Sequence, residues 1–265
     1  MTGAELDREV RGELRTLPKP LAEKVAGHLV MAGRLLDEEP ATALAHAREA
    51  RRLAPRVAAV REASGLVAYL NGEYSEALQD LRAVRRMAGS SAHLPVMADC
   101  ERGLGRPDRA LALARSEEAR DLSRAAQVEL LIVESGARSD MGQRDAAVLT
   151  LHGNPLRTGR GQPWWPRLAY AYADALLSAG RREEAHAWFA RAADADEDEE
   201  TDAAERLADL DGVAFLDGEA DSQAGSHDGP GSHDEPDSEP DSDAPGAEPR
   251  PDVAPDPAPG RDVDR

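Results

Sequence analysis

Apolar residues recur at intervals of three and four through most of the first 194 positions, which is the period of an amphipathic helix. The first such set is Leu6, Val10, Leu14 and Leu17. Prolines at positions 18 and 20 end this pattern, so residues 1–20 predict an N-terminal capping helix. The same period predicts helices at about residues 21–36, 41–54, 57–70, 74–87, 92–103, 107–119, 122–139, 143–151, 165–179 and 182–194. The breaks between them are short and contain glycine, which favours an all-α chain of antiparallel helix hairpins.

A short unit recurs five times within this helical pattern. It consists of an alanine and, four residues later, a second apolar residue; the alanines are Ala43, Ala77, Ala110, Ala147 and Ala185. Successive alanines lie 34, 33, 37 and 38 positions apart, and a glycine lies five residues before each of the last four. A fixed period of this length is typical of stacked repeats, in which neighbouring hairpins bury their apolar faces together. Alanine suits a close helix crossing, and glycine suits the left-handed residue that ends a helix.

The second and fifth hairpins resemble tetratricopeptide repeats (TPRs). The matching residues are Gly65, Ala68, Gly72, Tyr74, Ala77, Leu81 and Val84 in the second, and Ala173, Leu176, Gly180, Ala185, Phe189 and Ala192 in the fifth. The first hairpin matches through Ala43, Ala47, Ala50 and Pro55, but has Glu38 where the family usually has glycine. The third departs at Glu117, and the fourth keeps Gly142, Ala147 and Leu151. The resemblance covers residues 21–194 and implies five helix pairs in a right-handed superhelix whose first helices line a concave, peptide-binding face.

The charge of the chain is concentrated at its C-terminal end. Residues 1–193 carry 26 acidic and 28 basic side chains, whereas residues 194–265 carry 25 acidic and 4 basic ones. Residues 195–211 predict one acidic terminal helix, with Leu207 and Leu210 as its apolar contacts. Residues 212–265, rich in Asp, Ser, Pro and Gly, cannot bury enough apolar surface to offset their ordering entropy and predict a disordered acidic tail.

Composition also bears on the compartment of the protein. The single cysteine, Cys100, excludes an intrachain disulfide and is interpreted as a small core residue. The charged N-terminus does not resemble a signal peptide. The longest aliphatic run, residues 130–133, is far shorter than the roughly 20 residues that span a bilayer. We therefore expect a cytoplasmic protein that does not enter a membrane.

No catalytic motif is visible in the sequence, which favours a non-enzymatic protein without a cofactor. There is no phosphate-binding loop, no HExxH, no paired-cysteine metal site and no Gly-x-Ser-x-Gly. His227 and His233, beside aspartates in the tail, are more simply solvated than metal-ligating. We accordingly expect no catalytic, cofactor or metal residues.

The resemblance instead directs attention to the concave face. The positions expected there are His28, Glu62, Leu66, Tyr69, Asp99, Arg102, Glu129, Ile132, Tyr170, Asp174 and Leu177. Of these, the candidate partner-binding residues are Glu62, Leu66, Tyr69, Arg102, Tyr170 and Asp174. Family members that clamp a C-terminal carboxylate use lysine and asparagine, and this chain has no lysine beyond Lys24, so another mode of peptide binding is expected. The alternative is that these are ordinary exposed residues.

The intervals of 37 and 38 imply three or four extra residues, and one insertion can be placed at the Gly- and Pro-rich residues 152–163. It is either a tolerated surface loop or a partner contact, and the second interpretation adds the adjacent Trp164 and Trp165 as candidates. These two tryptophans, or the N-terminal helix, could also mediate homo-oligomer formation.

Two arginine clusters support a different function. One comprises Arg48, Arg51, Arg52, Arg56 and Arg61, and the other Arg82, Arg85 and Arg86. Nucleic-acid binding needs such cations on one face together with stacking aromatics, which are absent nearby. The preferred hypothesis is therefore an adaptor or scaffold that binds a protein or peptide in its groove, with an acidic tail that solubilises or screens the surface. A nucleic-acid or ribonucleoprotein-associated factor is the alternative.

Overall fold

The computed structural model describes residues 3–212, and that part of the chain is helical throughout, with no strands. Its N-terminal half contains α1 (Arg8–Leu14), α2 (Lys19–Arg34), α3 (Pro40–Leu53), α4 (Ala58–Leu70), α5 (Tyr74–Ala88), α6 (Leu94–Gly103) and α7 (Pro107–Ala114). Its C-terminal half contains the 3-10 helix η1 (Glu117–Asp121), α8 (Arg124–Asp140), α9 (Arg144–Leu151), α10 (Asn154–Thr158), α11 (Trp165–Ser178), α12 (Arg182–Ala193) and α13 (Ala203–Asp211). The predicted disordered tail and its two histidines, His227 and His233, lie outside the described residues.

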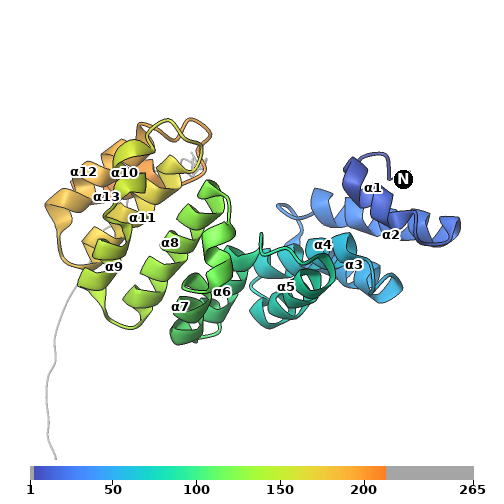
Figure 1. Ribbon diagram of the computed structural model, residues 1–265. Coiled ribbons are helices and arrows are strands. Elements are labelled where there is room, and N and C mark those ends of the chain that lie inside the picture. The colour runs from blue at the N-terminus through green and yellow to red at the C-terminus, as the bar shows by residue number, and fades with distance from the viewer. Residues whose placement is uncertain (1–2, 213–265) are drawn as a thin grey trace, which may run out of the picture. The chain divides into compact units, whose positions relative to one another are not determined.

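Five helix pairs form the body of the described chain. They are α2 with α3, α4 with α5, α6 with α7, α8 with α9, and α11 with α12. The pairs also contact one another along the chain: α3 packs on α4, α5 on α6, α7 on α8 and α9 on α11 (Figure 1). The predicted all-α, repeat-like architecture is therefore confirmed. The second helix of each pair contains one of the five recurring alanines, as the sequence period predicted.

Four of the turns within pairs share one backbone geometry. Their glycines, Gly72, Gly105, Gly142 and Gly180, have φ angles of 74°, 70°, 74° and 79°. In each turn the amide after the glycine donates a 2.9 Å hydrogen bond to the carbonyl five residues earlier, as from Glu73 to Ala68. This is the Schellman motif, which needs a residue with positive φ and thus favours glycine. The turn of the first pair, with Glu38 at this place, has no positive φ and uses a bond from Glu39 N to Leu35 O instead.

The recurring alanines lie where the two helices of each pair cross. All five, Ala43, Ala77, Ala110, Ala147 and Ala185, are fully buried. The residues four positions later, such as Leu81 and Phe189, extend the contact and are also buried in four of the five pairs. The third pair is the exception, since Ala114 is only partly buried and ends α7. The helix predicted to continue to residue 119 therefore stops at Ala114, and the chain turns into η1 at Glu117.

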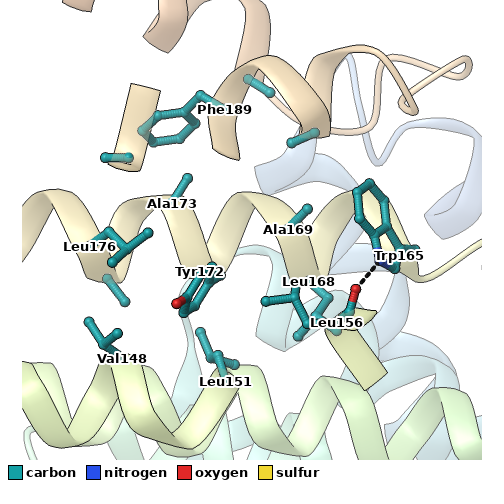
Figure 2. Packing of buried hydrophobic residues seen from close by; sticks show 14 of the residues in the cluster. Val148, Leu151, Leu156, Trp165, Leu168, Ala169, Tyr172, Ala173, Leu176 and Phe189 are labelled. Carbon is teal, nitrogen blue, oxygen red and sulfur yellow. Dashed lines mark hydrogen bonds between the residues drawn. The ribbon is translucent and has the colours of Figure 1, made fainter. Parts of the chain in front are cut away.

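The largest apolar cluster of the described residues centres on the fifth pair and includes residues of α8, α9, α10 and α13. Figure 2 shows α11 between two neighbours, with Ala169 and Ala173 towards Phe189 of α12, and other side chains towards Val148 and Leu151. The aromatic rings of Tyr170 and Phe189 meet edge to face, with centroids 5.4 Å apart. Burying such large side chains stabilises the fold by about 1.5–3 kcal/mol each.

The insertion at residues 152–163 is structured around Trp165. Leu156 of α10 is buried, and the indole Nε1 of Trp165 donates a 2.9 Å hydrogen bond to its carbonyl oxygen (Figure 2). Trp165 itself is only 3% exposed. The loop predicted here thus contains a short helix that is held against the core.

The first and last helices cover the ends of the helix pairs. α1 packs on α2 and α4, where Leu14 is buried and Leu6, Val10 and Leu17 are partly buried. At the other end α13 packs on α12, with Leu207 and Leu210 against the core. It begins at Ala203 rather than near residue 195, because the Asp196 carboxylate accepts hydrogen bonds from the amides of Glu200 and Thr201 and holds a turn there.

None of the described helices combines the length and the apolar character that crossing a membrane requires.

Candidate functional site

A groove of about 920 Å³ runs along the first helices of successive pairs. Its walls come from α6, α8 and α11, with Tyr69 of α4 at one end and residues 200–202 at the other. α6 packs against α8, and α8 against α11, so these three helices form a continuous wall. An apolar strip that includes Val96, Ile132 and Ala171 lies within it.

The structure places most of the expected concave-face positions in this groove. Those that line it are Tyr69, Asp99, Arg102, Glu129, Ile132, Tyr170 and Asp174. They lie on four helices, and the first and last of them, Tyr69 and Asp174, are 105 positions apart in the sequence. In the sequence, only the repeat pattern indicated that they share one face. Their role in binding a partner stays a prediction.

The remaining expected positions do not line the groove. His28 lies between α2 and α3, with its Nδ1 2.9 Å from Nδ1 of His46. Glu62 pairs with His93, and Leu66 is half-buried on α4. Leu177 packs against the C-terminal cluster. These four residues therefore lie apart from the candidate site.

The two tryptophans beside the insertion are also located elsewhere. Trp165 lies in the core, as described above, and Trp164 is partly buried against the same cluster. The Trp164 ring covers Gly159 so closely that an added Cβ would lie 2.2 Å from a ring carbon. Both side chains therefore fix the insertion, and neither lines the groove.

A network of hydrogen bonds and one ion pair ties α4, α6 and α8 together at one end of the groove. The Tyr69 hydroxyl donates to Asp99 Oδ2 at 2.7 Å, and Arg102 Nε donates to Asp99 Oδ1 at 2.9 Å. The same guanidinium lies over Gly136, where an added Cβ would be 2.8 Å from Nη1. Arg102 Nη1 then lies 3.7 Å from Asp140 Oδ2. Glycine at 136 thus allows the guanidinium to lie flat along α8 and to bridge two carboxylates.

A second set of contacts holds the wall formed by α8 and α11. Arg167 donates two hydrogen bonds to Glu129, at 3.1 and 3.0 Å. Farther along α11, Asp174 Oδ1 accepts a 3.1 Å bond from Arg206 of α13. That guanidinium also lies 5.5 Å from the Phe189 ring centroid. The last helix is thereby joined to the groove wall.

Two tyrosines that line the groove, Tyr69 and Tyr170, have raised pKa values. Burial raises the pKa of Tyr69, and the adjacent Asp99 carboxylate raises it further. Burial likewise raises the pKa of Tyr170, with Asp202 as the next cause. Both phenols are therefore neutral at physiological pH, and the Tyr69 hydroxyl donates a hydrogen bond to the Asp99 carboxylate.

The groove has a marked excess of negative charge. Its acidic lining residues are Asp99, Glu129, Asp140, Asp174, Glu200 and Asp202. Among residues 3–212, its only basic lining residues are Arg102 and Arg167, and each of them is already paired with a carboxylate. The groove can therefore attract cations and repel anions.

Asp140, Arg167 and Asp202 line the groove although sequence reasoning did not select them. The first two could have been found, because Asp140 follows Ile132 and Gly136 at helical spacing, and Arg167 precedes Tyr170 by three residues. Asp202 had no such signal, since it lies in the turn before α13 and reaches the groove only through tertiary folding.

Ion pairs occupy most of the arginine clusters. Arg51 and Arg61 donate to the fully buried carboxylate of Asp80, at 2.8 and 2.7 Å. The other pairs are Arg48 with Glu76, Arg52 with Glu49, Arg82 with Glu101, and Arg85 with Glu118. Within residues 3–212, only Arg56 and Arg86 of the two clusters have no ion pair. This pairing leaves few cations free to bind phosphate groups.

Nucleophilic and metal-binding chemistry finds little support in the described part of the chain. Cys100 is fully buried, and burial raises the pKa of its thiol to about 12, which disfavours the reactive thiolate. Residues 3–212 contain no group of three or more His, Cys, Asp or Glu side chains that could hold a metal ion.

No protein-family model matches the chain, and neither does any curated protein.

Proposed function

We propose that the protein is a non-enzymatic adaptor that binds a peptide or a segment of a partner protein in the groove lined by α4, α6, α8 and α11. The observation that carries this proposal is the groove itself, which runs across the first helices of four consecutive pairs. A surface that extends over several repeats suits an extended ligand, because each pair contributes its own contacts. We extend the proposal to a TPR-like superhelical stacking of the pairs.

The groove wall is organised before any ligand arrives. Tyr69 and Arg167 are held by carboxylates on neighbouring helices, and Arg102 is held by Asp99 on its own helix, so binding need not order them. Preorganisation of this kind lowers the entropic cost of association. The apolar strip offers hydrophobic contact, and the polar rim offers hydrogen bonds, which together are typical of protein-binding surfaces.

The acidic C-terminal segment completes the proposal. With 25 acidic and 4 basic side chains in residues 194–265, it gives the protein a large net negative charge, which opposes self-association. Its role in screening the arginine-bearing surface is proposed on charge alone. Removal of residues 213–265 should then raise partner affinity at low salt.

Affinity capture with groove variants tests the adaptor function. The full chain would be compared with Asp140→Arg and Asp174→Arg, which place long side chains in the groove. The control is Asp108→Arg, since Asp108 lies outside the groove in the first turn of α7. We expect the captured proteins to be lost with both groove variants and retained with the control. An unchanged set of captured proteins across all four chains would reject the groove as the binding site.

A further inference from the structure

We infer that the groove selects a positively charged segment, whose arginine or lysine side chains pair with Asp140, Asp174 and Asp202. This inference rests on the proposed function and names the chemical class of the partner.

The charge balance of the lining favours a cationic ligand. The six carboxylates exceed the two guanidiniums by four charges, and both guanidiniums lie within the network of the groove wall. A ligand carrying carboxylates would find no free cation among the lining residues that the structure describes. A ligand carrying guanidinium or ammonium groups would find several available acceptors.

The groove carboxylates differ in how many of their oxygens already accept a hydrogen bond. Asp99 uses both oxygens, towards Tyr69 and Arg102, and Glu129 uses both towards Arg167. Asp140, by contrast, has as its only described partner Arg102 at 3.7 Å, a separation too long for a hydrogen bond, and its side chain is 42% exposed.

Asp174 and Asp202 are similarly available. Asp174 accepts one bond from Arg206, and its side chain is 50% exposed. Asp202 is exposed, lies near Tyr170 and forms no ion pair with any described residue. Together with Asp140, these residues offer unused acceptor oxygens to the groove.

These three carboxylates belong to three different elements. Asp140 ends α8, Asp174 lies on α11 and Asp202 precedes α13. A ligand must therefore carry cations on more than one residue to reach all three. Ile132 and Ala171 line the same groove, so the segment between the cations can be apolar or small. Tyr69 adds a partly buried ring at one end, which an arginine can contact.

The charge of the groove also excludes one occupant. Residues 213–265 of the same chain carry 15 acidic and 3 basic side chains, and the groove carboxylates repel this excess of negative charge. The expected occupant is therefore a segment of another protein with alternating basic residues. Its association should be fast at low ionic strength and should weaken as salt screens the carboxylates.

Three fluorescent dodecapeptides provide the probes for a test on the full chain. They alternate alanine with arginine, glutamine or glutamate, and each carries a central benzophenone so that the binding position can be mapped after irradiation. Fluorescence anisotropy gives the affinity at low and physiological salt. We expect the arginine peptide to bind tightest and to cross-link to α8 and α11.

Two charge-matched variants distinguish the groove from the acidic segment. The groove variant combines Asp140→Asn, Asp174→Asn and Asp202→Asn, and the control combines Asp252→Asn, Asp256→Asn and Asp262→Asn. We expect the groove variant to weaken arginine-peptide binding by about tenfold, as three exposed ion pairs would. The control should bind within about twofold of the parent protein. Single Asp140→Asn and Asp174→Asn variants keep the test available if the triple variant does not fold.

Each outcome separates this inference from the proposed function. If the glutamine or glutamate peptide binds as tightly and cross-links to the groove, the charge selectivity is wrong and the groove function stands. If the control variant weakens binding as much as the groove variant does, the acidic segment binds the peptide and the inference is overturned. If no peptide cross-links to the groove, both the inference and the proposed function fail.

Discussion

The Tyr69 hydroxyl on α4 donates a 2.7 Å hydrogen bond to the Asp99 carboxylate on α6, and so joins the second and third helix pairs across one end of the groove. The same carboxylate accepts from Arg102, which reaches over Gly136 towards α8. Asp99 and Arg102 together thus connect three consecutive first helices. The shape of the groove at this end depends on that connection.

Tyr69→Phe should lower the free energy of unfolding by about 1–2 kcal/mol, because a partly buried hydrogen bond to a charged acceptor is lost. Urea denaturation measures the difference. Tyr74→Phe is the matched control, since its ring packs near Tyr69 at 6.2 Å between centroids and its hydroxyl forms no hydrogen bond with a described residue. Equal losses in the two variants would contradict a structural role for the Tyr69 hydroxyl.

Alkaline pH should destabilise the fold through Tyr69 and Tyr170. Burial and neighbouring carboxylates raise both pKa values, so the folded state favours the neutral phenols. This contribution is complete below about pH 10, the pKa of an unfolded tyrosine, and is lost as the pH rises above it. Urea denaturation at pH 8, 10 and 11 should show the decline, and the Tyr69→Phe/Tyr170→Phe double variant should show a shallower one.

Ala110→Leu should cost about 1–3 kcal/mol of stability, because the fully buried alanine leaves no space at the crossing of α6 and α7. Ala112→Leu is the control on the same helix, since Ala112 is exposed. Its effect should stay within about 0.5 kcal/mol. Thermal or urea unfolding of the pair measures this difference, and similar values would mean that the alanine period does not mark close helix crossings.

Gly142→Ala should destabilise the protein by about 1–2 kcal/mol, since its φ of 74° is unfavourable for a residue with a Cβ. No neighbouring atom would contact the added methyl group, so the cost is conformational. Gly33→Ala, within α2 and equally free of contacts, should instead stabilise by about 0.5–1 kcal/mol. Urea denaturation should show that Gly142→Ala lowers the free energy of unfolding and that Gly33→Ala raises it.

Asp80→Asn should cost about 3–5 kcal/mol, because it leaves the guanidiniums of Arg51 and Arg61 around a buried neutral group. Glu73→Gln is the control, since its side chain is 54% exposed and lies 3.7 Å from Arg48. That exposed pair should contribute less than about 1 kcal/mol. A small effect at Asp80, measured by denaturation at constant salt, would show that its ion pairs add little net stability.

The sequence predicted the helix pairs because their determinants are local. The three- and four-residue period identifies the buried faces, and the glycines identify the turns, as Gly72 and Gly180 illustrate. Element boundaries were predicted less accurately where the local pattern is less regular. Glu117 gave no reason to expect a 3-10 helix after α7, and the start of α13 depends on the hydrogen bonds of Asp196.

The candidate site was predicted where repeat spacing alone determines it. Tyr170 and Asp174 lie four residues apart on α11 and therefore line the groove together. Trp165 shows the limit of this reasoning, because its role depends on Leu156, whose carbonyl it reaches only after the insertion folds back. Likewise the arginine clusters looked cationic in sequence, and only the structure pairs Arg51 and Arg61 with Asp80.

The ion pairs between consecutive helix pairs have a consequence for assembly. Similar hairpins in one chain can dock on the wrong neighbour, since their alanine crossings are nearly interchangeable. Asp80 of α5 pairs with Arg51 of the first helix pair, and Glu101 of α6 pairs with Arg82 of the second. At these two junctions a hairpin docked on the wrong neighbour would leave each carboxylate with only the arginine of its own pair, Arg61 or Arg106. We expect these ion pairs to favour the native order of the hairpins.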